Sequence, residues 1–179
     1  MRVTGAAPTA ALVAVVLAAA LIGAWGFQYI GGLAPCPLCL LQRWPYYIGI
    51  PLAAALALAA QRGAPRWVVV SGLGALAIVL AVSVGFGVFH SGVEWKLWNG
   101  PDCSATAAGP IIPRGGSLMD AMRAQRIVLC DEAAWRLYGT LSLAGFNALI
   151  SAGLFVLVTL AGVRSWREAG GASPRHAPA

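Results

Sequence analysis

The sequence predicts an all-α membrane protein, a four-helix transmembrane bundle with a short first and a long second loop on one side. Hydrophobic residues make up 59% of the 179-residue chain, charged residues make up only 10%, and the mean hydropathy is +0.77. This composition is typical of membrane proteins and argues against a soluble domain. The charges are also segregated, because long windows without any charge alternate with short charged segments.

Four apolar runs occupy these windows. Each is roughly 17–26 residues long, which is enough for a helix to cross a hydrocarbon layer of about 30 Å. The predicted spans are about residues 10–30, 44–60, 67–89 and 138–163. The first run follows Arg2 and resembles a secretory signal peptide. It is longer than the usual apolar core of about 7–15 residues and runs into Trp25 and Phe27, so a retained span is predicted.

The second span is predicted to begin at or just after a pair of cysteines. Pro37 can occupy its first helical position, where a missing N–H costs nothing, with Cys36 near the cap. Pro45 and Pro51 are expected inside this span, where they would cause one or two kinks.

The domain organisation follows from these spans. Residues 1–163 are predicted to form one membrane domain, with loops 31–43 and 90–137, and residues 164–179 to form a disordered cytoplasmic tail rich in Gly, Pro and Arg. Two spans separate the loops, so both loops face the same compartment. Lys and Arg are denser beside the span ends on the opposite side, which favours the cytoplasm for that side and for both termini.

The net charge of +6 is spread over the loops and the tail. It forms no basic run and no basic surface with interleaved aromatic residues, so nucleic acid is not a predicted partner. Anionic membrane lipid is the simpler partner for these charges.

Four cysteines carry the chemistry. Cys36 and Cys39 form a Cys-x-x-Cys pair in the first loop, and Cys103 and Cys130 lie in the second. Three pairings are possible, and the short loop favours Cys36–Cys39. Such a pair opens and closes without large backbone movement, so it suits redox cycling. A structural bridge fits Cys103–Cys130 but fits the small Cys-x-x-Cys loop poorly. A zinc site is disfavoured because the second pair lacks ligand spacing, and no metal is predicted.

Arg43 is the only charged residue between Arg2 and Arg62. In a helix that starts near Pro37, it would share a face with Cys39. Its guanidinium and the helix N-terminus would lower the pKa of the Cys39 thiol. The same cation could stabilise an oxyanion that develops on a bound electron acceptor. An ordinary snorkelling anchor remains the alternative. Because the site lies at the bilayer boundary, the natural acceptor is lipid-soluble.

These features together resemble a known family. They are Trp25-x-Phe27-Gln28, Pro35-Cys36-x-Leu38-Cys39, Arg43, His90 at the start of the long loop, and Cys103 and Cys130. The chain resembles the DsbB family of disulfide bond formation proteins over nearly its whole length. The resemblance implies a multi-pass thiol:quinone oxidoreductase of the bacterial inner membrane, with its redox loops facing the periplasm. Its implied partners are a DsbA-like thioredoxin-fold protein, which it reoxidises, and ubiquinone or another membrane quinone, which it reduces.

The resemblance also implies a role for each cysteine. Cys103 would form the mixed disulfide with the partner, with Cys130 as its mate. Cys130 would then exchange with Cys36, and Cys39 would pass electrons to quinone beside Arg43.

His90 is implied as a further residue of the quinone pocket. Two departures affect the geometry of that pocket: Gln42 stands where the family can have a glutamate, and Pro45 lies in the second span. Two other interpretations remain open. One is a quinone reductase resembling vitamin K epoxide reductase, in which the Cys-x-x-Cys usually lies late in the chain. The other is a membrane scaffold with structural disulfides.

Overall fold

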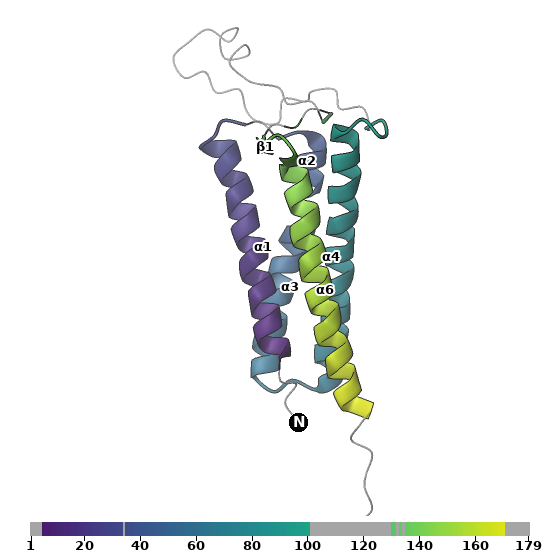
Figure 1. Cartoon of the computed structure of the whole chain (residues 1–179). Coiled ribbons are helices and arrows are strands. Elements are labelled where there is room, and N and C mark those ends of the chain that lie inside the picture. The colour runs from purple at the N-terminus through teal and green to yellow at the C-terminus, as the bar shows by residue number, and fades with distance from the viewer. Residues whose placement is uncertain (1–4, 34, 101–129, 132, 134, 171–179) are drawn as a thin grey trace, which may run out of the picture.

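The computed structural model describes residues 5–33, 35–100, 130, 131, 133 and 135–170 (Figure 1). Its elements are α1 (Ala6–Tyr29), α2 (Pro37–Leu41), α3 (Trp44–Gln61), α4 (Arg66–Glu94), β1 (Arg136–Leu137), β2 (Leu141–Ser142) and α6 (Leu143–Gly170). The long helices α1, α3, α4 and α6 run side by side, with α1 packed mainly on α3 and α4 mainly on α6 (Figure 1). The helix α2 and the two strands lie at one end of this bundle, while α1 begins and α6 ends at the other.

Three of the described helices are long and apolar enough to cross a membrane, namely α1, α4 and α6. The 24 residues of α1, for example, extend about 36 Å at about 1.5 Å per residue. The 18 residues of α3 do not reach the same apolar character, because Trp, Pro and Tyr residues fill its first turn. A helical membrane protein is therefore confirmed, and α3 as a fourth span stays a prediction.

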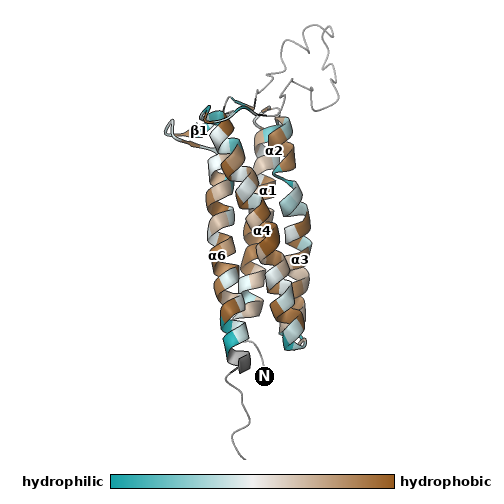
Figure 2. Cartoon of the chain, turned by 90° about the vertical axis from the view of Figure 1, so that its right-hand side faces the viewer, coloured by the Kyte–Doolittle hydropathy of each residue, from teal (hydrophilic) through white to brown (hydrophobic). Residues whose placement is uncertain are grey.

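Each long helix buries a narrow stripe and leaves its other apolar side chains on the outside. The stripe of α1 recurs every three or four residues and consists of Ala6, Ala10, Val13, Leu17 and Leu21. Leu12, Val15 and Ile22 on the same helix are half or more exposed. Hydrophobic residues cover the middle of the bundle in Figure 2. An apolar outer surface of this kind is stable against lipid but not against water.

Helix α4 packs tightly against the backbone of α6 at Gly87. A Cβ at this position would lie 2.8 Å from the backbone nitrogen of Ala148 in α6. Gly85, two residues earlier, has open space around it. Only a residue without a side chain allows the α4 and α6 backbones to pack this closely at position 87.

The predicted second span is divided in two. Cys36 caps α2 and Pro37 is its first residue, as predicted, but α2 ends at Leu41 and a new helix starts at Trp44. Pro45 therefore lies in the first turn of α3, where a missing N–H costs nothing. The kink predicted at this residue is wrong for that reason. Pro51 does lie inside α3.

The ends of the last two long helices also differ from prediction. Helix α4 continues beyond position 89 to Glu94. Helix α6 starts at Leu143 and not at 138, because β1 and β2 pair as a short antiparallel hairpin. Tyr138 and Gly139 form its turn with φ angles of 49° and 74°, which a helix cannot accommodate.

The tail prediction is partly wrong. Residues 164–170, predicted to be disordered, continue helix α6 to Gly170. Residues 171–179 and Cys103 lie outside the described part of the chain.

Candidate redox site

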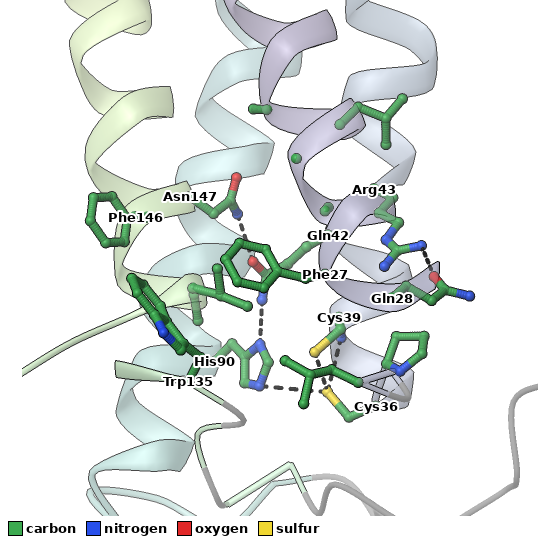
Figure 3. A pocket seen from close by; sticks show the side chains of 18 of the residues that line it. Phe27, Gln28, Cys36, Cys39, Gln42, Arg43, His90, Trp135, Phe146 and Asn147 are labelled. Atoms are coloured by element: carbon green, nitrogen blue, oxygen red, sulfur yellow. Dashed lines mark hydrogen bonds between the residues drawn. The ribbon is translucent and has the colours of Figure 1, made fainter. Parts of the chain in front are cut away.

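The Cys-x-x-Cys pair sits in the first turn of α2. Cys36 is the N-cap, with φ −72° and ψ 164°, and its Sγ accepts a hydrogen bond of 3.1 Å from the Cys39 backbone N–H. The two sulfur atoms lie 2.7 Å apart (Figure 3). A disulfide bond is about 2.05 Å long, so the pair needs only a small movement to close.

The two thiols of the reduced pair ionise very differently. The hydrogen bond from the Cys39 side chain, opposed by burial and aided by His90, lowers the pKa of Cys36 from 9.0 to about 5. The same sulfur–sulfur hydrogen bond and burial raise the pKa of Cys39, and Arg43 lowers it only weakly. Two sulfurs this close cannot both carry a negative charge. The predicted lowering of the Cys39 pKa is therefore wrong for the reduced pair, since the sulfur–sulfur hydrogen bond and burial keep the proton on Cys39.

His90 reaches the pair from α4. It is buried, and its Nε2 lies 3.7 Å from the Cys36 Sγ. Its Nδ1 forms a hydrogen bond with the side-chain nitrogen of Gln42. The structure thus places His90 beside the sulfur of Cys36, deeper than a residue at the end of a span would be.

Glu94 is a site residue that the sequence did not reveal. It is buried, and its Oε1 lies 3.9 Å from His90 Nε2. Its Oε2 has no hydrogen-bond partner among the described residues. The available signal was its spacing of four from His90, which places both side chains on one helix face.

Arg43 lies in the turn between α2 and α3. Its Nη1 donates a hydrogen bond of 2.6 Å to Gln28 Oε1 at the end of α1 (Figure 3). In the part of the chain that the structure describes, no carboxylate lies within ion-pair distance of this guanidinium. Arg43 and Cys39 line the same cavity, although the helix that was predicted to carry both ends at Leu41.

This cavity has a volume of about 380 Å³, within the range of about 300–1,000 Å³ common for small-molecule sites. Aromatic rings form one wall: the Trp135 ring centroid lies 5.6 Å from that of Phe27 and 6.3 Å from that of Phe146. Small and aliphatic residues of α1 and α6 line its interior, among them Ala20, Gly23, Ala24 and Ile150. The shape and chemistry suit a flat, apolar ring with polar groups at its edge.

Cys130 lies at the same end of the bundle. It is buried and packs in one cluster with Cys36, Leu38 and Val93. It is disulfide-bonded in this structure. A cysteine of the second loop therefore lies close to the first-loop pair, although about 90 residues separate them in sequence.

Cys36, Cys39 and His90 also bring three donor atoms of the zinc-binding type within 4.8 Å of one another. Two thiolates on one tetrahedral zinc, with Zn–S bonds of about 2.3 Å, lie about 3.8 Å apart. The observed sulfur separation of 2.7 Å is well below that value. The geometry is closer to that of a dithiol and disulfide couple than to that of a metal site.

The family model described as "Disulfide bond formation protein DsbB" matches residues 6–161. The chain belongs to the DsbB family. The Disulfide bond formation protein B of Marinobacter nauticus is 32% identical over 170 residues, which cover 88% of this chain and 95% of that protein. The protein of the same name from Verminephrobacter eiseniae is 33% identical over 150 residues, covering 79% of this chain and 78% of that protein. No solved structure matches the chain.

Membership of the DsbB family confirms the predicted thiol:quinone oxidoreductase of disulfide bond formation. It also favours this function over the vitamin K epoxide reductase-like enzyme and the structural scaffold. The roles of individual residues in this DsbB-family protein rest on the geometry above.

Proposed function

We propose that the chain reoxidises a periplasmic DsbA-like thioredoxin-fold protein and passes the electrons to ubiquinone or another membrane quinone. The observation that carries this proposal is the position of the Cys36–Cys39 dithiol on a cavity with aromatic walls and a guanidinium at its edge. A bound quinone would supply an acceptor for two electrons and two protons, which is what a dithiol releases when it closes.

The electrons follow the cysteines in order. A thiolate of the reduced partner attacks Cys103, forms a mixed disulfide and releases Cys130. Cys130 attacks Cys36 of the Cys36–Cys39 disulfide and releases Cys39 as a thiolate. The packing of Cys130 in one cluster with Cys36 supports this exchange.

The second thiolate of the partner then attacks the mixed disulfide, leaves as the partner disulfide and releases Cys103, which attacks Cys130 and frees Cys36. The Cys36–Cys39 pair closes again as its two electrons and two protons pass to quinone. The balance is partner dithiol plus quinone giving partner disulfide plus quinol.

The exchange moves the negative charge from the attacking sulfur of Cys130 to the sulfur of Cys39. The hydrogen bond that the Cys39 thiol donates to Cys36 and the negative charge on the Cys36 sulfur are two causes of the raised Cys39 pKa. Both disappear once Cys36 is joined to Cys130, because a disulfide sulfur is neutral. Burial still raises the Cys39 pKa, and Arg43 lowers it. The Cys39 thiolate is therefore formed at the cavity that is proposed to bind quinone.

The cavity residues divide into two groups. Phe27, Trp135 and Phe146 offer flat faces on which a quinone ring can stack. Arg43, held by Gln28, can donate hydrogen bonds to a carbonyl oxygen that gains negative charge. The residues of α1 and α6 that line the cavity provide an apolar surface for the lipid tail of the quinone.

The orientation in the membrane completes the proposal. With α3 as a fourth span, both ends of the chain lie in the cytoplasm and α2 lies at the periplasmic surface of the bacterial inner membrane. The partner then reaches the second loop from the periplasm, while quinone reaches the cavity from the lipid.

The proposal is tested with purified chain in lipid nanodiscs, reduced partner and ubiquinone. Cys36→Ser and Cys39→Ser should each abolish quinone reduction. This reaction is measured through the ultraviolet absorbance of the quinone. Cys39→Ser should still exchange with the partner at Cys103, and acid trapping of that mixed disulfide serves as the folding control. Turnover retained by either variant would reject the relay.

A second measurement separates the relay from a scaffold. Free thiols of the parent protein are trapped with and without quinone in the nanodisc while the reduced partner is present. The relay accumulates reduced Cys36 and Cys39 when quinone is withdrawn. A scaffold would keep the same disulfides in both samples.

A further inference from the structure

A line of buried polar side chains runs from the dithiol into the bundle. It consists of His90, Gln42, Asn147, Tyr46, Ser83 and Ser151, drawn from α3, α4, α6 and the turn before α3, and none is more than 9% exposed. Buried polar groups are costly unless they are hydrogen-bonded, and each member of this line is bonded to another. Some groups in this line can only donate and others can only accept, and these groups fix the direction of the hydrogen bonds between them.

The orientation of Asn147 is fixed first. Its Nδ2 lies 3.5 Å from the main-chain carbonyl oxygen of Ser83, which can only accept. On its other side, Oδ1 accepts from the Tyr46 hydroxyl and lies 3.3 Å and 3.4 Å from the hydroxyls of Ser83 and Ser151. Turning the amide over would set its oxygen against the Ser83 carbonyl. The Asn147 nitrogen must therefore face Ser83 O and Gln42.

The orientation of Gln42 follows from that of Asn147. Asn147 Nδ2 donates a hydrogen bond of 2.7 Å to Gln42, so the Gln42 atom at this position is the oxygen Oε1. The Gln42 nitrogen then faces His90 Nδ1 (Figure 3). An amide nitrogen can only donate, so His90 Nδ1 must accept with its lone pair. In a neutral imidazole the proton then resides on Nε2.

We propose that Asn147 and Gln42 are positioning residues that hold His90 as the neutral Nε2–H tautomer, with this N–H directed at the sulfur of Cys36. The Cys36 Sγ lies 3.7 Å from Nε2, closer than Glu94 Oε1 at 3.9 Å. His90 thereby serves the dithiol as a neutral hydrogen-bond donor, and the direction of that donor is set by the Ser83 carbonyl in the middle of α4.

Several other groups that can carry a charge surround Cys36 and His90. Cys39 and Cys130 pack against Cys36, Glu94 lies beyond His90, and Arg43 lines the shared cavity. The hydrogen bond from His90 is one cause of the lowered Cys36 pKa. The tautomer of His90 does not depend on the proposed function. Its contribution to electron transfer does rest on that function.

Nitrogen NMR of histidine tests the proposal directly. The chain contains only two histidines, so in full-length chain labelled with ¹⁵N-histidine the change His176→Gln leaves the His90 signals alone. The ¹⁵N shifts distinguish protonated from unprotonated ring nitrogens. In the reduced protein we expect Nε2 to be protonated and Nδ1 to be unprotonated, with one tautomer present.

Two variants perturb the tautomer in different ways. Gln42→Glu replaces the donor by an isosteric acceptor, so Nδ1 should carry a proton. Asn147→Leu removes the group that orients Gln42, so both neutral tautomers should appear. Asn99→Leu, at an exposed asparagine, is the matched control and should leave the signals unchanged.

A protonated Nδ1 in the parent protein would overturn the proposal, as would a single unchanged tautomer in Asn147→Leu. If Asn147→Leu does not fold, the parent protein and Gln42→Glu still decide the question. Quinone reduction is measured separately, so a loss of the proposed function with the expected tautomer present counts against the function alone.

Discussion

The hydrogen bond between the two sulfurs of α2 is the feature on which the Cys36 thiolate depends most. The perturbation is Cys39→Ala in a chain that also carries Cys103→Ala and Cys130→Ala, so that Cys36 is the only thiol. Losing a hydrogen bond to a charged group costs about 1.5–3 kcal/mol, or about 1–2 pKa units. The Cys36 pKa of about 5 should therefore rise to about 6–7.

The assay follows the ultraviolet absorbance of the thiolate as pH is varied. At about pH 6 the ionised fraction should fall from about nine-tenths to between about a half and a tenth. Cys39→Ser is the matched control, because its hydroxyl still donates and should keep the midpoint nearer to about 5. The thiolate exists above the pKa and is lost below it, so reactions of the parent dithiol should slow about tenfold per pH unit below about pH 5. Equal midpoints in the alanine variant, the serine variant and the parent pair would refute the reasoning.

Three further changes test the cavity and the bundle. Arg43→Ala should weaken the apparent quinone affinity by about 10- to 100-fold, the value of a hydrogen bond to a developing charge, and leave partner affinity unchanged. Arg62→Ala, at the exposed C-cap residue of α3, should change neither. Trp135→Ala should raise the quinone KM by about two- to tenfold through loss of stacking, and an unchanged KM in steady-state assays would exclude this ring from the site. Gly87→Ala should destabilise the bundle by about 1–3 kcal/mol in denaturant titration, because its Cβ meets the α6 backbone, whereas Gly85→Ala should not.

Much of the fold could be predicted because long apolar segments identify membrane helices. The apolar windows predicted α1, α4 and α6, and Cys36 and Pro37 predicted the start of α2. The break between α2 and α3 was not predicted, since neither Gln42 nor Arg43 is a helix breaker and both keep near-helical angles. The hairpin before α6 was also missed, because a two-residue strand has no periodic pattern.

In the site, too, contacts between residues that are near in sequence could be predicted, whereas contacts between distant residues could not. The pairing of Cys36 with Cys39 follows from their spacing along one helix turn, and Arg43 lies near them because it is in the turn directly after α2. The contact between His90 and Cys36 does not follow from local spacing, because the two residues are more than 50 positions apart in sequence. Asn147 gave one usable signal, as a lone amide within an apolar run usually marks a functional position.

The apolar outer surface of the bundle has a practical consequence for every quinone measurement. A carrier that dissolves in lipid meets the protein at a mole fraction set by the bilayer area, and not at a concentration set by the volume of buffer. Diluting the sample with buffer should leave occupancy unchanged, whereas adding empty vesicles should lower it. Affinities for the acceptor are comparable between preparations only when they are expressed per lipid.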